Sequence, residues 1–467
     1  MLLSTETMGG ILKKGKMEIP NKALLRFPII LISHLLAVSN PVLAQHSPAW
    51  SQWGQNPQHT GNVAVAGQRL RGKLSDLTFD PYVNQEIAEA GALLMHYQVP
   101  LVNATHIYME FKTGKYVSCN PPGSGQPFPC GPDAWNTEIW NERALQWQNG
   151  QLGQVWNFAT DWKPVPNSGT SPSTRTLGGW EPLFQPALAG QYIYVPGAAG
   201  TVYKLKQRDG TVASQINPFG TLDPSVFVFG PLTVDNAGNI YYNVIQVNTN
   251  WPWQEDAENS WLVKVRPDDS TATVTYVSLL PSAPPECLGT FGFAKAPYPW
   301  PPTPTSVPPS TPCGTQRPAL NVAPVISVDG STLYAVSRGH RWGRASYLLA
   351  VNTADLSPQW SVSLQGLLDD GCSVLLPPNG QPGGCSVGAT TGVDPTQNTL
   401  GAGILGDTAS ASPVIAPDGS ILLGVDTAYN YGRGHLLKFS SLGQLQANTT
   451  LVGIARLRSI RTTAPIR

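Results

Sequence analysis

Charged residues are scarce in this chain of 467 residues: they make up 12% of it, and 29 Lys and Arg balance 29 Asp and Glu. A chain without net charge gives no electrostatic reason to expect nucleic acid or an anionic membrane as a partner. Local catalytic patterns are missing too, since there is no GxSxG, HExxH or P-loop sequence. No nucleic-acid partner is therefore predicted, and the catalytic residues stay unknown.

Cysteine is sparse as well, and no two cysteines are adjacent or spaced as CxxC. The six cysteines form three local pairs, Cys119 with Cys130, Cys287 with Cys313, and Cys372 with Cys385. Each pair brackets a segment rich in Gly and Pro, as expected for disulfides that staple loops lacking a core of their own. Other pairings stay open. A zinc site is the alternative, but no CxxC or His cluster supports it, so no metal site is predicted.

Long apolar runs are confined to the N-terminus. The run FPIILISHLLAV at residues 27–38 follows a basic region and precedes Ala44, which predicts a signal peptide over residues 1–44, with Met17 as an alternative start. A membrane anchor is the alternative, although His34, Ser39 and Pro41 interrupt the short run. We expect a secreted protein, extracellular or periplasmic, without a transmembrane segment after cleavage.

Gly and Pro are abundant, with 46 and 44 residues, and they punctuate a repeat. Its clearest copy, residues 322–364, has a strand VAPVISV, a turn at Asp329 and Gly330, a strand TLYAVS, a strand YLLAV and a last strand around Trp360. Four short strands joined by turns predict a four-stranded antiparallel sheet.

Copies of this unit occur throughout the chain after the signal peptide. They span residues 95–160, 184–215, 229–280 and 411–450. Units of this size that recur about five times are typical of the blades of a β-propeller. The predicted fold is therefore an all-β propeller over residues 45–467, with a β-sandwich as the alternative.

The repeats resemble the PQQ-binding-like, or quinoprotein-like, β-propellers. That family ends a blade with Ala-x-Asp-x-x-Thr-Gly-x-x-x-Trp, and Ala350 and Trp360 match it, whereas Asn352, Asp355 and Leu356 depart from it. Asp209 and Gly210 keep the turn in another copy, where Ser214 replaces the Trp, and Trp156 ends the first copy. The resemblance implies that these Trp side chains dock between blades.

An entry segment, WSQWGQNPQHTG at residues 50–61, precedes the first copy. In such propellers an N-terminal strand often completes the last blade, which leaves no open sheet edge, and we expect this role here. Residues 74–92 fit either a short helix or an irregular strand.

Three loops between second and third strands carry aromatic side chains beside polar ones. The binding candidates are Trp251, Trp253, His340, Arg341, Trp342, Tyr429, Tyr431 and Arg433. Such side chains suit a rim that binds a glycan, a protein or a small molecule. The alternative, which we favour, is that these aromatics pack on neighbouring loops.

Function is predicted as non-catalytic binding or scaffolding, with no cofactor. The alternative, implied by the resemblance, is an oxidoreductase that uses PQQ and calcium on alcohols or sugars. Many such enzymes have a pair of adjacent Cys residues, and this sequence has none. It also has no residues that map to the base or the calcium ligands of the family. Asp407 and Asp426 lie near apolar strands and are the carboxylates that would be tested first.

The C-terminal tail departs from the repeat. Residues 451–467 contain Arg456, Arg458, Arg461 and Arg467 and no acidic residue where further strands are expected. Codons can be chosen for the tail such that a shifted frame encodes a blade opening, with Pro and an Asp-Gly turn. We hypothesise a frameshift that truncates the propeller, and an immediate stop in the shifted frame of the gene would refute it.

Overall fold

The computed structural model describes residues 49–64, 69, 72–90, 97–117, 137–165, 183–291, 299–381, 383–407, 411–427 and 434–451. The predicted signal peptide, the pair Cys119 and Cys130, the loop residues Tyr429, Tyr431 and Arg433, and the Arg-rich tail lie outside these ranges. No helix in the described ranges is long and apolar enough to cross a membrane.

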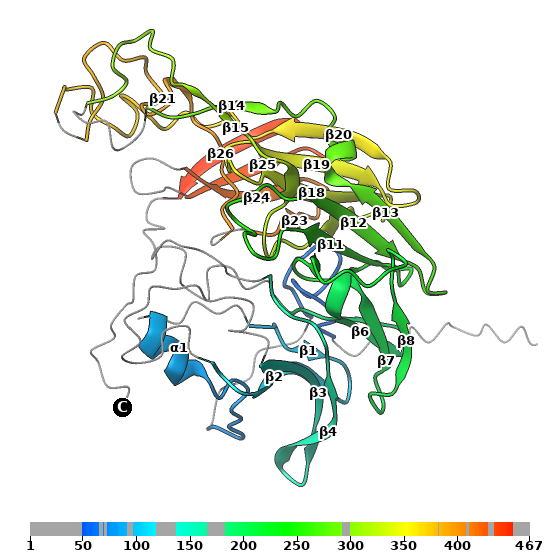
Figure 1. Cartoon of the computed structure of the whole chain (residues 1–467). Coiled ribbons are helices and arrows are strands. Elements are labelled where there is room, and N and C mark those ends of the chain that lie inside the picture. Colours follow the sequence, from blue (N-terminus) through cyan, green and yellow to red (C-terminus); the bar gives the residue numbers. More distant parts are fainter. Residues whose placement is uncertain are drawn as a thin grey trace, which may run out of the picture. The chain divides into compact units, whose positions relative to one another are not determined.

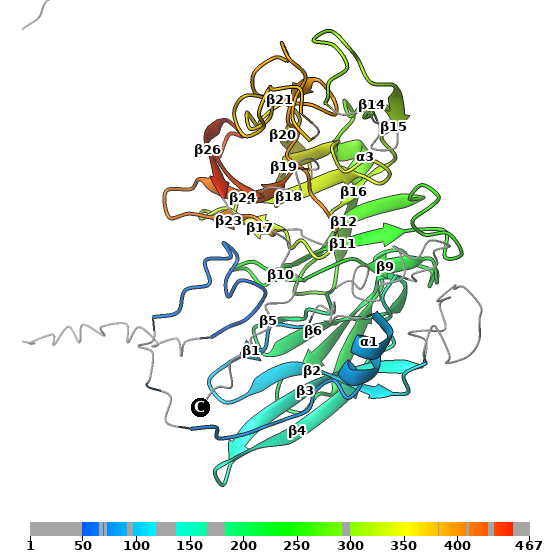
Figure 2. The same cartoon turned by 90° about the vertical axis from the view of Figure 1, so that its left-hand side faces the viewer.

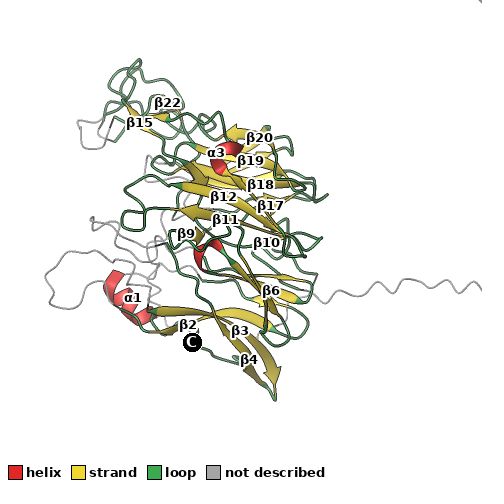
Figure 3. Ribbon diagram, turned by 45° about the vertical axis from the view of Figure 1, so that its right-hand side comes forward, coloured by secondary structure: helices red, strands yellow, loops and turns green. Residues whose placement is uncertain are grey.

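The described part is almost entirely strand and loop (Figure 3). Five antiparallel sheets of four or five strands follow one another along the chain, and each is a blade (Figure 1). Blade 1 contains β1 (Leu101–Val102), β2 (Ile107–Gly114), β3 (Glu138–Gln148) and β4 (Gln151–Ala159); blade 2 contains β5 (Ala187–Ala189), β6 (Tyr192–Pro196), β7 (Val202–Lys206) and β8 (Val212–Ile216). Blade 3 contains β9 (Val226–Val228), β10 (Thr233–Val234), β11 (Ile240–Gln246), β12 (Asn259–Val265) and β13 (Thr271–Thr275).

Blade 4 contains β16 (Gln316–Pro318), β17 (Val325–Ile326), β18 (Thr332–Gly339), β19 (Ser346–Asn352) and β20 (Pro358–Ser363). Blade 5 contains β23 (Val414–Ile415), β24 (Ile421–Asp426), β25 (Gly434–Phe439) and β26 (Leu445–Leu451). Outside the blades lie the helices α1 (Val83–Ala90) and α3 (Tyr276–Leu279), the short helix η3 (Ala198–Gly200), and two small sheets, β14 (Glu286–Leu288) with β15 (Ser310–Pro312), and β21 (Val393–Asp394) with β22 (Thr399–Leu400).

In four blades a proline directly precedes the short strand that opens the sequence repeat, which we call the first strand of the blade although β9 and β16 come before it in blades 3 and 4. Pro100, Pro186, Pro324 and Pro413 stand before β1, β5, β17 and β23. Proline suits this place because the first residue of a strand need not donate a ladder hydrogen bond. The repeat signal in the sequence therefore marks real strand starts, and the prediction of an all-β fold of propeller blades is confirmed.

The core lies between successive blades because each strand buries side chains on both faces. In β18, Leu333 and Ala335 pack with Tyr241 and Leu262 of blade 3. Tyr334 and Val336 on the opposite face pack with Leu423 and other apolar side chains of blade 5. Alternation along a strand thus joins three consecutive blades.

Two tryptophans lock one blade onto the next, as the family resemblance implied. Trp156 of blade 1 donates its Nε1 hydrogen to the carbonyl of Gln207 at 2.9 Å, in the turn after β7. Trp360 of blade 4 does the same with Ser441 at 3.2 Å, in the turn after β25. In the second case Gly443 lies against the indole, so a glycine is needed where the ring meets the backbone.

Gly443→Ala is expected to destabilise the protein by roughly 2 kcal/mol, because a Cβ there would lie 2.8 Å from the Trp360 ring and because Gly443 has a φ of +78°. Thermal unfolding measures the effect. Gly419→Ala is the matched control, since Gly419 has a φ of +79° but nothing within 4 Å of its added Cβ. Equal losses in the two variants would show that contact with Trp360 contributes nothing.

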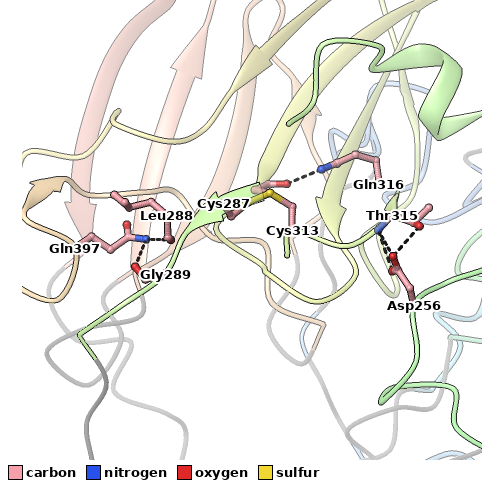
Figure 4. The surroundings of a disulfide bond; sticks show 9 residues. Asp256, Cys287, Leu288, Gly289, Cys313, Thr315, Gln316 and Gln397 are labelled. Carbon is pink, nitrogen blue, oxygen red and sulfur yellow. Dashed lines mark hydrogen bonds between the residues drawn. A yellow bond between two sulfur atoms is a disulfide. The ribbon is translucent and has the colours of Figure 1, made fainter. Parts of the chain in front are cut away.

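Two insertions between blades pack on one another and carry the disulfides Cys287–Cys313 and Cys372–Cys385, the pairing that the sequence suggested. The side-chain amide of Gln397 in the second insertion donates to the carbonyls of Leu288 and Gly289 in the first, at 2.6 and 3.1 Å (Figure 4). The hydrogen bonds of Gln397 and the two disulfides thus cross-link insertions that have only small apolar clusters of their own.

Candidate functional site

An N-terminal segment, residues 50–59, crosses the first strands of all five blades, and we call it the strap. It lies beside β5 and β10 in Figure 2. Backbone hydrogen bonds join Trp50 to Val102, Ser51 to Leu188, Pro57 to Ile326 and Gln58 to Ile415. These contacts follow the order of the blades, so the strap ties their inner strands together.

The remaining blade is bound by the Gln52 side chain. Its Nε2 donates to the carbonyl of Val234 at 3.0 Å, and its Oε1 accepts the backbone N–H of Val234 at 2.7 Å. Gln52 is fully buried. The Gln52 amide thus makes the two hydrogen bonds that a neighbouring strand would make to Val234. A side chain therefore pairs the backbone N–H and C=O of β10.

His59 closes the strap on blade 5. Its Nδ1 lies 2.9 Å from the carbonyl of Pro413, so this nitrogen carries the hydrogen. Burial lowers the pKa of His59 to about 4, although the bond to Pro413 opposes the shift. The imidazole is therefore neutral at physiological pH. The sequence predicted that this segment completes the last blade. The described contacts show instead that it binds the first strand of every blade.

Asp407 lies in the segment before blade 5, which pairs with β24 through Ile404 and Asp426, and two arginines of blade 4 fix it. It accepts hydrogen bonds from Arg317 at 2.9 and 2.6 Å, from Arg338 at 2.9 Å and from the backbone of Leu320 at 3.1 Å. Burial opposes ionisation, but the charges of Arg317 and Arg338 outweigh it and hold the pKa of this carboxyl far below its usual value. A carboxylate so stabilised is a poor general base, so Asp407 has a structural role. Asp426, the other such carboxylate, ends β24 and pairs through its backbone with Ile404.

The predicted loop aromatics pack mostly on neighbouring loops. Trp253 and His340 come from loops of adjacent blades, and their rings stack 5.8 Å apart at 4°. Trp342 packs against the disulfide Cys287–Cys313. Trp251 is 43% exposed and Arg341 is also exposed. The loops therefore bring Trp253 and His340 together, but the described residues form no aromatic rim with Trp251.

A pocket of about 680 Å³ opens between blades 2 and 3, bounded on one side by the strap. Tyr192 and Tyr194 of β6 supply an aromatic wall, and the turn after β10 supplies Asp235 and Asn236. Gln52 and Pro57 are the strap residues that line it with Ser51. The volume is in the range of small-molecule sites.

Charges at this pocket are already paired within the protein. Lys204 lies 4.7 Å from the centroid of the Tyr192 ring, while its Nζ contacts Asp269 at 2.6 Å and the carbonyl of Pro267 at 2.8 Å. Asp235 accepts hydrogen bonds from the backbone of Ala237 at 2.9 Å and from that of Asn239 at 2.8 Å. A ligand would therefore meet the Tyr192 ring and charged groups that already have partners, an environment that suits an uncharged polar molecule.

A second polar cluster is buried in blade 1, where Glu110 and Glu142 face each other across β2 and β3. Gln98 donates its backbone N–H to Glu110 at 3.3 Å and its side-chain amide to Glu142 at 3.2 Å. Glu142 is fully buried, and its Oε2 has no partner among the described residues. Burial raises the pKa of Glu142 well above its usual value; the bond from Gln98 opposes this shift and the charge of Glu110 adds to it.

Glu142→Gln is expected to stabilise the protein at pH 8 by about 1 kcal/mol, or roughly 2 °C in Tm, and to change little at pH 4. A carboxyl whose pKa is raised by folding contributes stability below its unfolded pKa, and this is lost as pH rises through the folded pKa. Glutamine keeps the neutral form at every pH. Thermal unfolding across pH tests this, with the exposed Glu258→Gln as control; a gain that is the same at pH 4 and pH 8 would contradict it.

The residues present do not fit the PQQ and calcium alternative well. In the described ranges no three His, Cys, Asp or Glu side chains gather as a metal site. Asp407, one of the two carboxylates that the sequence suggested for such a site, is committed to Arg317 and Arg338. No step is therefore derived through a quinone.

Comparison with known proteins finds matches among solved structures only. No family model and no curated protein matches its sequence. Solved structures that match include a quinohemoprotein alcohol dehydrogenase from Comamonas testosteroni, with 11% identity, a TM-score of 0.42 and coverage of 88% of this chain and 50% of that one. This likeness concerns the fold alone.

Two further matches are of the same kind. A europium-containing methanol dehydrogenase is 11% identical with a TM-score of 0.42, covering 87% of this chain and 58% of that one. The quinohemoprotein alcohol dehydrogenase ADHIIG from Pseudomonas putida HK5 is 12% identical with a TM-score of 0.41, covering 87% and 48%. This chain thus spans about half the length of these three solved structures.

Sequence reasoning missed the pocket between blades 2 and 3. Tyr192 and Tyr194 alternate in YIYV and read as an ordinary strand, and the turn at Asp235 reads as an ordinary hairpin. One sequence signal pointed to the pocket, namely Ser214 at the position where other blades have Trp. In the structure the polar side chains of Lys204 and Asp269 occupy the space that a docked indole would fill.

Proposed function

We propose that this protein is a non-catalytic recognition propeller that binds a neutral carbohydrate in the pocket between blades 2 and 3. The observation that carries the proposal is the Tyr192 ring beside two charged groups that already have partners, Lys204 in an ion pair with Asp269 and Asp235 in hydrogen bonds to its own turn. A sugar ring offers an apolar face for Tyr192 and hydroxyls for neutral groups, and it needs no counter-ion from the protein.

The strap supports binding rather than turnover. Its residues line the pocket and are themselves bound to the first strands of the blades, which holds the pocket in a preformed state. A preformed site suits recognition because little ordering free energy is lost on binding. Asp407 and His59 are each held in one charge state, Asp407 by the charges of Arg317 and Arg338 and His59 by burial.

The test is a glycan array followed by calorimetric titration of the mature protein with neutral oligosaccharides. We expect binding that is lost on Tyr192→Ala, by about tenfold or more in Kd. Tyr347→Ala is the matched control, because Tyr347 is a half-buried tyrosine of blade 4 that does not line the pocket. No binding of any neutral glycan by folded protein would refute the proposal.

A parallel titration with PQQ and calcium, followed by a dye-reduction assay on alcohols and sugars, tests the other reading. Stoichiometric quinone binding with turnover would establish an oxidoreductase and overturn the proposal of a non-catalytic protein. Quinone binding unaffected by Tyr192→Ala would place that site away from the pocket.

A further inference from the structure

A second pocket lies between blades 1 and 2, next to the pocket between blades 2 and 3, which we now call the first pocket. The second pocket has a volume of about 580 Å³. Blade 1 and blade 2 both contribute to its wall, with Asn103, His106 and Tyr108 from the former and Gln191, Lys206 and Arg208 from the latter. Gln191, in the turn between β5 and β6, lines both pockets. The two pockets are therefore adjacent at this turn.

The charge of the second pocket differs from that of the first. Its wall contains Lys206 and Arg208, and none of the described lining residues is acidic. Lys206 is exposed and forms none of the ion pairs within the described ranges, whereas Lys204 on the same strand contacts Asp269 at 2.6 Å. Arg208 contacts Asp209 at 2.8 Å, but its side chain is 84% exposed, so this pair is weak. The second pocket therefore suits an anionic group.

A pair of opposite residues connects the two pockets. Tyr192, the aromatic wall of the first pocket, lies directly opposite Lys206 in the antiparallel pairing of β6 with β7. Residues in this relation project from the same face of a sheet, with Cβ atoms about 5 Å apart. A group attached to a sugar ring on Tyr192 therefore comes close to Lys206.

The turn between the pockets is held in place by Gln207. Its side-chain amide donates to the carbonyls of Tyr192 at 2.8 Å and Gly190 at 3.3 Å, and its Oε1 accepts a hydrogen bond from the Asn103 amide at 2.9 Å. The same Asn103 amide donates to the Tyr108 hydroxyl at 3.0 Å. Blade 1 is thus tied to the turn of blade 2, and both pockets keep a fixed spacing before a ligand arrives.

We propose that the carbohydrate on Tyr192 is a neutral unit of an acidic oligosaccharide, and that a neighbouring unit places a carboxylate or a sulfate ester beside Lys206 in the second pocket. This inference rests on the proposed function and narrows its class of ligand. The neutral ring lies where Lys204 already has a partner, and the anion lies where Lys206 has no described ion pair.

Calorimetric titration of the mature protein with a matched series of tetrasaccharides tests the proposal. The backbone is the neutral oligosaccharide that binds best on the glycan array, and in the series one unit at a time carries either a uronate carboxyl or a sulfate ester. We expect one acidic member to bind roughly tenfold more tightly than the neutral tetrasaccharide. This preference should shrink as salt is raised from about 0.05 to about 0.5 M, because exposed charges are screened. Uronate and sulfate members distinguish the two sources of the anion.

Lys206→Gln should weaken binding of the acidic tetrasaccharide by about fivefold. Lys115→Gln is the matched control, because Lys115 is an exposed lysine directly after β2 that lines neither pocket, and it should change nothing. Tyr192→Ala should weaken the acidic and the neutral tetrasaccharide alike. Thermal melts establish that each variant is folded, and Arg208→Gln replaces Lys206→Gln if the latter is not.

The outcomes separate this inference from the proposed function. Neutral oligosaccharides that bind while no acidic member binds more tightly would overturn the inference alone. So would an acidic preference that persists in full in Lys206→Gln, or acidic binding that Tyr192→Ala leaves unchanged, because the anion would then lie elsewhere. Inorganic sulfate that binds as tightly as the sulfated tetrasaccharide would reduce the second pocket to a site for a free anion. No binding of any oligosaccharide would refute both proposals.

Discussion

Asp407→Ala is expected to destabilise the protein by about 3 to 5 kcal/mol, the range for a buried ion pair that loses one partner. Arg317 is 1% exposed, and its guanidinium is bidentate with Asp407. Removing the carboxylate leaves a buried positive charge beside that of Arg338. Urea unfolding followed by tryptophan fluorescence measures the loss.

The control for this variant is Asp418→Ala. Asp418 also accepts a hydrogen bond from a cation, Lys438, but its side chain is 59% exposed, so its loss is expected to be much smaller than that of Asp407→Ala. The double variant Arg317→Met with Asp407→Leu should recover much of the stability, because no charge remains unpaired except that of the less buried Arg338. If Asp407→Ala unfolds like Asp418→Ala, the cluster does not join blades 4 and 5.

The blades could be predicted from the sequence because their signals are local and recur. A Pro, a short strand, an Asp-Gly turn and a second strand occupy a dozen residues, and the pairing of Val325 with Tyr334 lies within that span. The docking of Trp360 was implied by family resemblance, but its acceptor, Ser441, was not identifiable, since the turn in blade 5 reads Ser-Leu-Gly rather than Asp-Gly.

The contacts at the inner strands could not be predicted, because they join residues far apart in the chain. Gln52 and Val234 are 182 residues apart, and Arg317 and Asp407 are 90 residues apart. Neither Gln52 nor Asp407 belongs to a pattern with a period. Their partners can be identified only from the three-dimensional structure, in which blades 3, 4 and 5 lie beside one another.

The loop candidates illustrate the difference between composition and geometry. Trp253 and His340 were correctly grouped as residues of equivalent loops, and they do stack. Stacking buries the surface that a ligand would use, since His340 is 6% exposed. The same residue types therefore fit a binding rim and a packed pair of loops, and only the distance between the rings separates the two.

Gln52→Ala is expected to destabilise the protein by about 3 kcal/mol, since the buried N–H and C=O of Val234 would both lose their partner. The alanine would also leave a cavity where a fully buried amide stood. Because the strap binds every blade, its loosening should expose the inner strands together. Hydrogen exchange is therefore predicted to rise at Leu188, Ile326 and Ile415, whose N–H groups donate to strap carbonyls.

Gln444→Ala separates this effect from the loss of any glutamine, because Gln444 is exposed in the turn before β26 and its change should alter stability by less than about 0.5 kcal/mol. Faster exchange confined to Val234 in Gln52→Ala would mean that the strap binds each blade separately. Faster exchange at Ile415, in blade 5, would mean that one side chain in blade 3 holds the whole strap in place. The second result is the one we expect, because Gln52 is the strap side chain with no exposed surface and its two hydrogen bonds to Val234 fix the register of the strap at its centre.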